Sequence, residues 1–345
     1  MHSDVKRLIQ YGIPLVLAAA LLWYVFQIIN PGELLARFQE ADYRWIVLSS
    51  AISVVAYWSR AKRWCLLLEP LGYQPAVFHS FLALMSGYFV NLFLPRVGEV
   101  TRCGVLNKLE KVPVNISFGT VVAERIFDVI MLFILLVFTF LLEFKRLGSI
   151  LQDLLRSKLT PLYHALQNTT TVITLLISGV VLIGIAVTLF LVYKKPLQKN
   201  KLYLKVVAFF HGMGQGLLSV RKMRNPSAFF FHTILIWVMY YFMSYVLFFA
   251  MPQTAGLGIR AGFTILIMGG LGMSAPVQGG FGTFHFLVGN ALVLYGLSQQ
   301  DGLILATFMH TSQTLFTLLT GGLSLLAVLF IQRKKPVVEV SVGHH

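Results

Sequence analysis

The sequence predicts an all-α polytopic membrane protein with about six full transmembrane helices and two broken or re-entrant helix pairs arranged as an inverted repeat. The composition is the first reason. Of the 345 residues, 57% are hydrophobic and 12% are charged, whereas soluble domains have roughly 25% charged residues. No polar stretch between the apolar segments is long enough to bury a core of its own. Residues 1–345 are therefore predicted to form a single transmembrane domain, without a separate soluble catalytic domain.

The full spans are predicted from apolar stretches that charged residues bound. The first stretch, Tyr11–Ile29, could be a signal peptide, but its near-full length and the lack of a small-residue cleavage site favour an uncleaved helix. A second span runs from Trp45 to the basic cluster at Arg60. The remaining predicted spans are Ser117–Leu142, Val172–Tyr193, Phe229–Ala250 and Ile304–Ile331.

The basic residues follow the pattern of a membrane protein and not that of a nucleic-acid-binding protein. The formal net charge is +15, but the lysines and arginines gather at the ends of apolar spans, as the positive-inside bias predicts. The clusters at Arg60–Arg63, Lys194–Lys205 and Arg333–Lys335 are predicted to be cytoplasmic. The charge pattern thus indicates an inner (cytoplasmic) membrane protein with both termini in the cytoplasm, anionic lipid as its counter-surface and no nucleic-acid partner; the bacterial source is what the resemblance described below implies.

Two shorter apolar segments decide the predicted topology. Phe78–Leu94 is stopped by Pro95 and precedes the basic stretch Arg96–Lys111. A full crossing would put that stretch outside the cell, so we predict that the segment enters from the cytoplasm, breaks and returns. Ala261–Leu297, broken at Pro276, is interpreted in the same way from the outer side, although two complete crossings give an equally consistent count.

The two broken segments share a Pro-x-x-Gly turn between apolar helices, from Pro95 to Gly98 and from Pro276 to Gly279. Short, interrupted segments in corresponding places of two halves are typical of inverted-repeat transporters, whose site lies where the breaks meet. The alternative is that proline and glycine are simply common in membrane helices.

Two connections are amphipathic. Residues 194–227 are predicted to be a cytoplasmic basic connector, because apolar residues recur from Leu202 at helical spacing and lysines and arginines lie at both ends. Such a helix suits the anionic inner leaflet, with a solvated linker as the alternative. The leucines between Leu147 and Leu155 suggest a similar short outer helix before Pro161.

Charged residues at membrane depth are the candidate functional residues, because a charge at a helix centre costs about 2.5–3.5 kcal/mol on insertion scales. One cluster is Arg96–Arg102 at the first break, and the other is Glu124–Asp128 inside an apolar helix. Glu124 and Asp128 share a helix face, and Arg125 can reach Asp128. Arg96, Arg102 and Arg125 balance Glu99, Glu124 and Asp128, so the set is predicted to be electrically neutral.

Two interpretations of these clusters stay open. In the first, arginine–carboxylate pairs only staple the broken hairpin to the next helix. In the second, the guanidinium group of Arg96 or Arg102 stays free to bind a phosphate, Gly98 adds backbone N–H groups, and Glu99 orients the arginines. A lipid headgroup fits this chemistry.

The second break offers uncharged hydrogen-bonding groups and glycines that allow close backbone approach. Its candidate substrate-binding residues are Gln278, Gly279, Gly280 and His285, with His310 and Gln313 as further polar lining. A lone buried histidine is more often a packing residue, and two histidines on different helices are not a metal motif. Cys65 and Cys103 form no CxxC motif, so the sequence predicts no metal and no cofactor.

Three runs together resemble the lysylphosphatidylglycerol synthase transmembrane-region family. They are Leu94–Arg102, Glu124–Asp128 and Ala275–Gly282, and the resemblance extends over about Leu15–Ile331. The family includes the flippase half of the multiple peptide resistance factor. The resemblance implies a polytopic lipid flippase fold with the two charged clusters as signature positions. No aminoacyl-transferase domain follows the last predicted helix, so lysylation is not carried over; His285 stands where many relatives have Glu.

The sequence thus predicts a flippase-like domain that moves a phosphate-bearing phospholipid or glycolipid between leaflets and is not an enzyme. No Walker A motif is present, so the drive would come from a gradient, the membrane potential or equilibration. The predicted partners are membrane lipids with an anionic or polyprenyl/glycolipid headgroup, and a second copy or a separate lipid-modifying enzyme. The alternatives are a non-transporting scaffold or partner subunit, and an intramembrane lipid-modifying enzyme.

Overall fold

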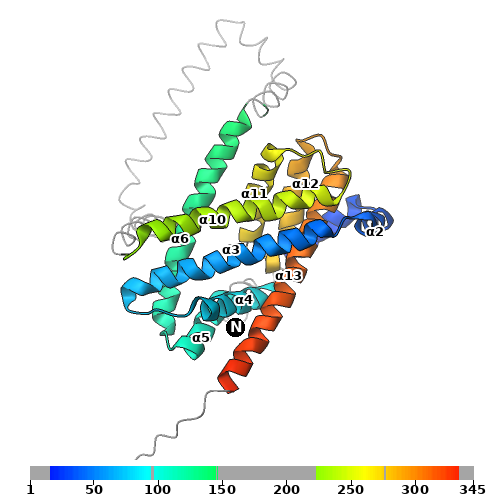
Figure 1. Ribbon diagram of the computed structural model, residues 1–345. Coiled ribbons are helices and arrows are strands. Elements are labelled where there is room, and N and C mark those ends of the chain that lie inside the picture. Colours follow the sequence, from blue (N-terminus) through cyan, green and yellow to red (C-terminus); the bar gives the residue numbers. More distant parts are fainter. Residues whose placement is uncertain (1–15, 95–96, 145, 147–222, 276, 334–345) are drawn as a thin grey trace, which may run out of the picture. The chain divides into compact units, whose positions relative to one another are not determined.

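A computed structural model describes residues 16–94, 97–144, 146, 223–275 and 277–333, and every regular element in these ranges is a helix (Figure 1). The chain divides into two compact units, Met1–Leu136 with Val220–His345, and Val137–Ser219. The site lies within the first unit. The predicted span Val172–Tyr193, the outer helix near Leu147 and most of the connector 194–227 lie outside the described residues, as do Pro95, Arg96 and Pro276.

The N-terminal region contains the first predicted helix and a second helix that was not predicted. Helix Val16–Ile28 lies within the predicted first span. After a bend of 82° it is followed by the additional helix α2 (Pro31–Glu40). The Asn30 side chain caps α2 by accepting a hydrogen bond from the backbone N–H of Gly32 at 2.9 Å, and Pro31 occupies the first turn, where its missing N–H costs nothing. Arg37 pairs with Glu33 within α2 and with Asp301 at the start of the last helix.

Three described helices are long and apolar enough to cross a membrane. They are α6 (Val114–Leu142), α10 (Pro226–Tyr245) with its extension η3 (Val246–Ala250), and α13 (Gln299–Arg333). The bent N-terminal pair would be a fourth. The all-helical membrane fold is therefore confirmed. The described residues contain three or four candidate spans, and the predicted count of six stays a prediction because one of those spans lies outside the described residues.

Helix α3 (Arg44–Leu68) has 25 residues, about 37 Å at 1.5 Å per residue, and passes alongside α10 (Figure 1). It is longer than the predicted second span because it continues through the basic cluster into a buried end. Trp64 and Leu68 in that end belong to a hydrophobic cluster with residues of α4 and α5.

Each broken segment folds back on itself as a helical hairpin. The first consists of α4 (Val77–Phe93) and α5 (Val97–Glu110), and the second of α11 (Ile259–Ser274), the short turn η4 (Gln278–Gly280) and α12 (Thr283–Val293). In the first hairpin the backbones meet at Gly87 and Gly98, and in the second Gly272 lies against the backbone of Phe284. The predicted breaks are therefore present, and glycines close both hairpins.

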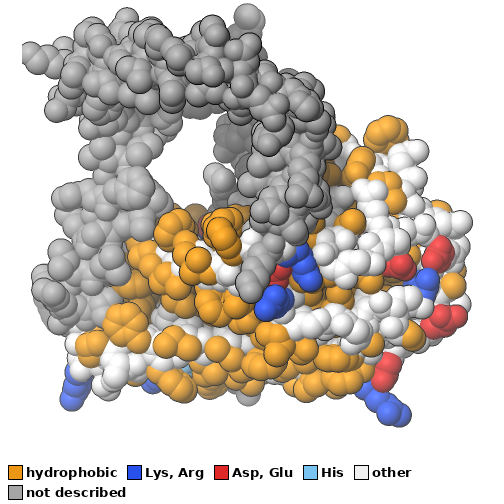
Figure 2. Space-filling view, turned by 90° about the horizontal axis from the view of Figure 1, so that it is seen from above, with side chains coloured by type: hydrophobic (Ala, Val, Ile, Leu, Met, Phe, Trp, Pro, Cys, Tyr) orange, Lys and Arg blue, Asp and Glu red, His pale blue; other side chains and the backbone are white. Residues whose placement is uncertain are grey.

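The hairpins pack against the long helices. Helix α4 packs on α3 and α13, and α12 packs on α13, which brings the two hairpins to the same helix (Figure 1). Hydrophobic side chains cover much of the face seen in Figure 2, and charged ones are few. The outward residues of α6 include Phe133, Ile134 and Leu141, each more than half exposed, as expected of a surface in contact with lipid.

Candidate functional site

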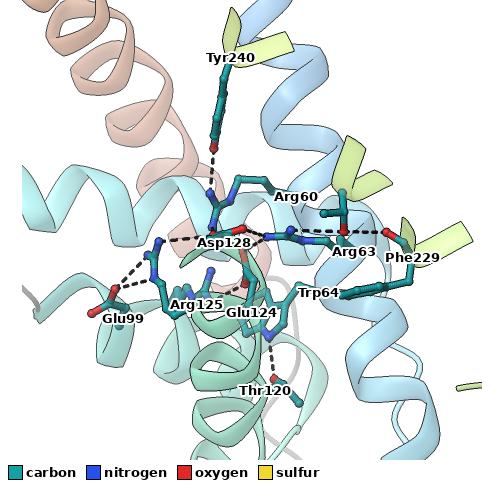
Figure 3. A network of polar contacts seen from close by, with 12 residues as sticks. Arg60, Arg63, Trp64, Glu99, Thr120, Glu124, Arg125, Asp128, Phe229 and Tyr240 are labelled. Atoms are coloured by element: carbon teal, nitrogen blue, oxygen red, sulfur yellow. Dashed lines mark hydrogen bonds and ion pairs between the residues drawn. The ribbon is translucent and has the colours of Figure 1, made fainter. Parts of the chain in front are cut away.

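Seven charged side chains on α3, α5 and α6 form one network, which we call the charged network; Figure 3 labels its members other than Arg102. Its members are Arg60, Arg63, Glu99, Arg102, Glu124, Arg125 and Asp128. Glu124 is at its centre and is fully buried. Its carboxylate accepts hydrogen bonds from Arg60 at 2.5 Å, from Arg63 at 3.2 Å and from Arg102 at 2.8 Å. A buried carboxylate with this many guanidinium partners holds three helices together.

Asp128 lies one turn further along α6 and shares two of these partners. It accepts from Arg60 Nη2 at 3.0 Å and from Arg63 Nη2 at 2.6 Å. Arg125 also reaches it, at 3.8 Å, as the sequence spacing predicts. The other terminal nitrogen of Arg60 donates to the hydroxyl of Tyr240 on α10 at 2.8 Å. The network therefore connects α3, α6 and α10.

The interpretation of Arg60 and Arg63 as topological charges at a membrane surface was incomplete. Their side chains are 5% and 0% exposed, whereas Lys62 between them is exposed. The spacing of three residues puts the two arginines on one face of α3 and the lysine on another. On α6 the carboxylates Glu124 and Asp128 are four residues apart and likewise share one face. These two spacings together are the sequence signal that would have identified Arg60 and Arg63 as partners of the carboxylates.

Arg102 was expected to offer a guanidinium group free to bind a phosphate; in the structure its Nε and Nη1 have no hydrogen-bond partner among the described residues, but the group is buried and its other nitrogen is paired with a carboxylate. The residue is 2% exposed. One terminal nitrogen is bonded to Glu124, and the guanidinium carbon lies 4.6 Å from the centre of the Trp64 ring, a cation–π contact. Trp64 in turn donates to Thr120 on α6 at 2.9 Å. Arg102 is thus placed as an interior brace between α3, α5 and α6.

Glu99 and Arg125 form the accessible edge of the charged network. Arg125 Nε and Nη2 lie 3.1 and 2.9 Å from the same Glu99 oxygen. The side chains are 41% and 26% exposed for Arg125 and Glu99. This pair joins the start of α5, next to the first break, to the middle of α6.

The charged network carries excess positive charge. Among the described residues it holds four guanidinium groups and three carboxylates, which leaves one net positive charge when all are ionised. The predicted neutral set omitted Arg60 and Arg63 and included Arg96, which lies outside the described residues. Because an uncompensated buried cation is unfavourable, the network favours an anion nearby.

A cavity of about 570 Å³ lies beside the charged network. Arg60, Glu99, Arg125 and Asp128 line it together with apolar and aromatic residues. Its volume is within the range of about 300–1,000 Å³ typical of small-molecule sites, and such sites are likewise mostly apolar with a few polar groups.

Both breaks contribute to this cavity. Asn91 and Leu92 come from the end of α4, and Val277, Gly279 and Gly280 come from the second break. A Cβ atom at Gly279 would lie 3.5 Å from a Leu92 methyl group, so the breaks are in contact. Gly98 was expected to offer its N–H to an anion, but this N–H donates to Asn91 Oδ1 at 2.7 Å.

The remaining predicted residues of the second break divide into two groups. Gly279, Gly280 and Gln313 line the cavity, whereas Gln278, His285 and His310 do not. His310 Nε2 donates to the Gly279 carbonyl oxygen at 2.8 Å. The ring of His285 lies 4.7 Å from that of His310, and both residues are buried. No group of metal-binding residues occurs among the described part of the chain.

Replacing His310 with leucine is expected to lower the free energy of unfolding by about 0.5–1.5 kcal/mol, because the half-buried Gly279 carbonyl loses its hydrogen bond. His310→Gln keeps an amide donor and is expected to lose less. The measurement is the thermal unfolding midpoint of the purified protein in detergent.

The matched control is His285→Leu. No described residue bonds to the buried Nδ1 of His285, so removing this nitrogen is expected to be nearly neutral. A larger loss for His285→Leu than for His310→Leu would contradict the role of His310 in holding the second break.

Two known proteins are similar to parts of this chain. The chain is 31% identical over 87 residues to a UPF0104 membrane protein of Methanocaldococcus jannaschii, which covers 24% of this chain and 26% of the relative. It is 28% identical over 116 residues to glycosyltransferase AglD of Haloferax volcanii, covering 33% and 18% of the two chains. The chain thus spans about a quarter of the first relative and less than a fifth of the second. No solved structure matches it.

The family comparison covers most of the chain. Residues 12–321 match the family described as the lysylphosphatidylglycerol synthase TM region, and this stretch contains both hairpins and the whole charged network. This chain therefore belongs to the lysylphosphatidylglycerol synthase transmembrane-region family.

Proposed function

We propose that this protein moves a phosphate-bearing phospholipid or glycolipid between the leaflets of a bacterial cytoplasmic membrane, without covalent chemistry. One observation carries the proposal: a cavity formed by both broken hairpins is lined by Arg60, Glu99, Arg125 and Asp128, and the charged network to which these four residues belong has a net positive charge among the described residues. An anionic headgroup needs counter-charge and shelter from hydrocarbon, and this cavity supplies both.

Arg125 is the group best placed to bind the phosphate. It lines the cavity, is 41% exposed, and is bonded to one Glu99 oxygen with a longer contact to Asp128, whereas Arg63 and Arg102 do not line the cavity. A guanidinium group matches two phosphate oxygens in a bidentate geometry. Phosphate would compete with Glu99 for Arg125, and Glu99 could then assist release by recovering its partner.

The lengths of the hairpin helices support re-entrant segments. Helices α4 and α11 have 17 and 16 residues, about 25 Å each, less than the roughly 30 Å of a bilayer core. In an inverted repeat these hairpins enter from opposite sides and their breaks meet at the site, consistent with the contact between Leu92 and Gly279. The proposed orientation places both termini in the cytoplasm.

The charge pairing gives a reason to prefer transport to lipid chemistry. Glu99 and Asp128 are the carboxylates that line the cavity, and both are paired with arginines, which opposes their action as a general base. The buried histidines lie outside the cavity lining. A non-transporting scaffold would not need the charged side chains that line the cavity. Variants that change these side chains therefore distinguish a transporter from a scaffold.

The test is leaflet accessibility of fluorescent anionic phospholipids and glycolipids in proteoliposomes. Arg125→Gln removes the charge and leaves a shorter neutral amide, and Glu99→Gln removes the negative charge of the carboxylate that Arg125 is paired with. Arg125→Gln is expected to slow movement about tenfold or more, because a hydrogen bond to a charged group contributes about 1.5–3 kcal/mol.

Arg37→Gln is the matched control, because it breaks ion pairs of α2 that lie away from the cavity. It is expected to move lipid at the native rate. Equal rates for the native protein, Arg125→Gln and empty vesicles with every headgroup would support the scaffold, and a new lipid species in the extracts would support an enzyme.

A further inference from the structure

We infer that the headgroup taken by this cavity is a glycosyl phosphate: an anionic phosphate with a neutral sugar attached, and not a cationic aminoacyl headgroup. The inference rests on the proposed function, because it names the substrate class of the same cavity. It is carried by four aromatic side chains that line the cavity beside the charged network, Tyr57, Tyr88, Trp237 and Tyr240. We call them the aromatic wall.

The aromatic wall is a packed structure contributed by three helices. Tyr57 on α3 lies with its ring centre 5.3 Å from that of Tyr88 on α4 and 6.5 Å from that of Tyr240 on α10. Trp237, one turn before Tyr240, lies 6.0 Å from it. Each of these contacts is edge-to-face, a favourable aromatic geometry. The wall joins the charged network through Tyr240, which points to Arg60 in Figure 3.

Several hydrogen-bond donors of the cavity lining have no partner within the described residues. The indole N–H of Trp237 and the Nε–H of Arg60 are buried and unbonded there. The hydroxyls of Tyr57 and Tyr88 make no hydrogen bond to another described residue either, whereas that of Tyr240 accepts from Arg60. Buried donors without acceptors are unfavourable, so the cavity is built for a ligand with several acceptor oxygens.

A sugar meets both requirements of this lining. Its hydroxyl and ring oxygens accept hydrogen bonds, while its C–H face packs against aromatic rings, and the indole and phenol groups combine an apolar body with a polar tip. Asn91 and Gln313 add amide groups to the same lining. The phosphate would lie at Arg60 and Arg125, and the sugar along the aromatic wall.

An ammonium group is the competing occupant, because aromatic rings also bind cations. Here the guanidinium carbon of Arg60 already lies 6.0 Å from the Tyr88 ring centre, and the charged network has a net positive charge among the described residues. A second cation at the wall would be repelled by the Arg60 guanidinium group, which is next to the Tyr88 ring. The neutral sugar therefore fits better than an aminoacyl group.

The experiment has a binding arm and a movement arm. Binding of a soluble hexose 1-phosphate to the purified full chain in detergent is compared with binding of inorganic phosphate. In proteoliposomes, leaflet movement is compared for polyprenyl phosphoryl hexose, phosphatidylglycerol and lysyl-phosphatidylglycerol. The variants are Trp237→Leu, which removes ring and donor, and Trp237→Phe, which removes the donor alone. Trp58→Leu is the control, since Trp58 is next to Tyr57 on α3 but contacts Phe81 and does not line the cavity.

We expect the native protein to favour the hexose-bearing ligand in both arms. Trp237→Leu is expected to weaken hexose phosphate binding and movement about tenfold, from the loss of one ring contact and one hydrogen bond, with inorganic phosphate and phosphatidylglycerol changed less than about twofold. Trp237→Phe should lie between, and Trp58→Leu should match the native protein. Tight binding of the soluble hexose phosphate without lipid movement would identify a free sugar phosphate as the ligand and overturn the lipid source.

Equal effects of Trp237→Leu on every headgroup, or preferential movement of the lysyl lipid, would overturn the sugar assignment while leaving the proposed function standing. No movement of any lipid by the native protein, with no hexose phosphate binding, would overturn both.

Discussion

Replacing Glu124 with leucine is expected to lower the free energy of unfolding by at least about 3–5 kcal/mol, because removing one partner of a buried ion pair leaves uncompensated charge. The carboxylate is fully buried and accepts from Arg60, Arg63 and Arg102. The first two arginines keep Asp128 as a partner, whereas Arg102 keeps only its contact with Trp64 within the described residues. The measurement is the thermal unfolding midpoint in detergent.

Two further variants sharpen this test. Glu33→Gln removes a carboxylate that is 39% exposed and pairs with Arg37, so its expected loss is below about 1 kcal/mol. Glu124→Leu combined with Arg102→Met removes the most isolated cation, and the double variant is expected to recover part of the stability. If Glu124→Leu were as mild as Glu33→Gln, the charged network would have to be hydrated and could not brace the three helices.

The broken hairpins could be predicted because their signals are local. Proline interrupts helices and glycine is common just past their ends. The end of α4 and the start of α5 lie on either side of the predicted break at Pro95. The second break contains Gly279, Gly280 and Gly282, all with positive φ, a backbone conformation that glycine adopts without strain. Helix α2 was not predicted, because it lies between the two apolar stretches that were assigned as the first and second spans.

The ion-pair partners on neighbouring helices could not be predicted, because sequence spacing reports only which residues share a face of one helix. Spacing predicted that Arg125 reaches Asp128, and the structure confirms this at 3.8 Å. The closer pairs, Arg125 with Glu99 at 2.9 Å and Arg102 with Glu124 at 2.8 Å, each join two helices. Such pairs depend on packing distances, which a single sequence does not contain.

The aromatic wall could not be predicted from the sequence either, because its members lie on different helices. Tyr57, Tyr88 and Tyr240 lie on three helices, and the pair Tyr57 and Tyr240 is separated by most of the chain. Tyrosines are common near membrane interfaces, so none of them was distinctive in the sequence. The close packing of α3 with α4 and α10 makes them neighbours.

Replacing Gly98 with alanine is expected to destabilise the first hairpin and to impair the site next to it. A Cβ atom there would collide with the Gly87 carbonyl oxygen and with the side chain of Asn91, whose Oδ1 accepts the Gly98 N–H. Overpacking of this kind costs about 1–3 kcal/mol. Because Glu99 is the next residue, separation of α4 and α5 would also displace the Glu99–Arg125 pair from the cavity lining.

The same substitution at Gly104 provides a control on the same helix. Nothing lies within 4 Å of a Cβ atom built at Gly104, and alanine is favoured over glycine in helices by about 0.5–1 kcal/mol. Gly104→Ala is therefore expected to raise the unfolding midpoint while Gly98→Ala lowers it, and only Gly98→Ala should slow lipid movement. If both substitutions shifted the unfolding midpoint in the same direction, the close approach of α4 and α5 at Gly87 would not be part of the folded state. The first hairpin would then not be positioned to line the cavity.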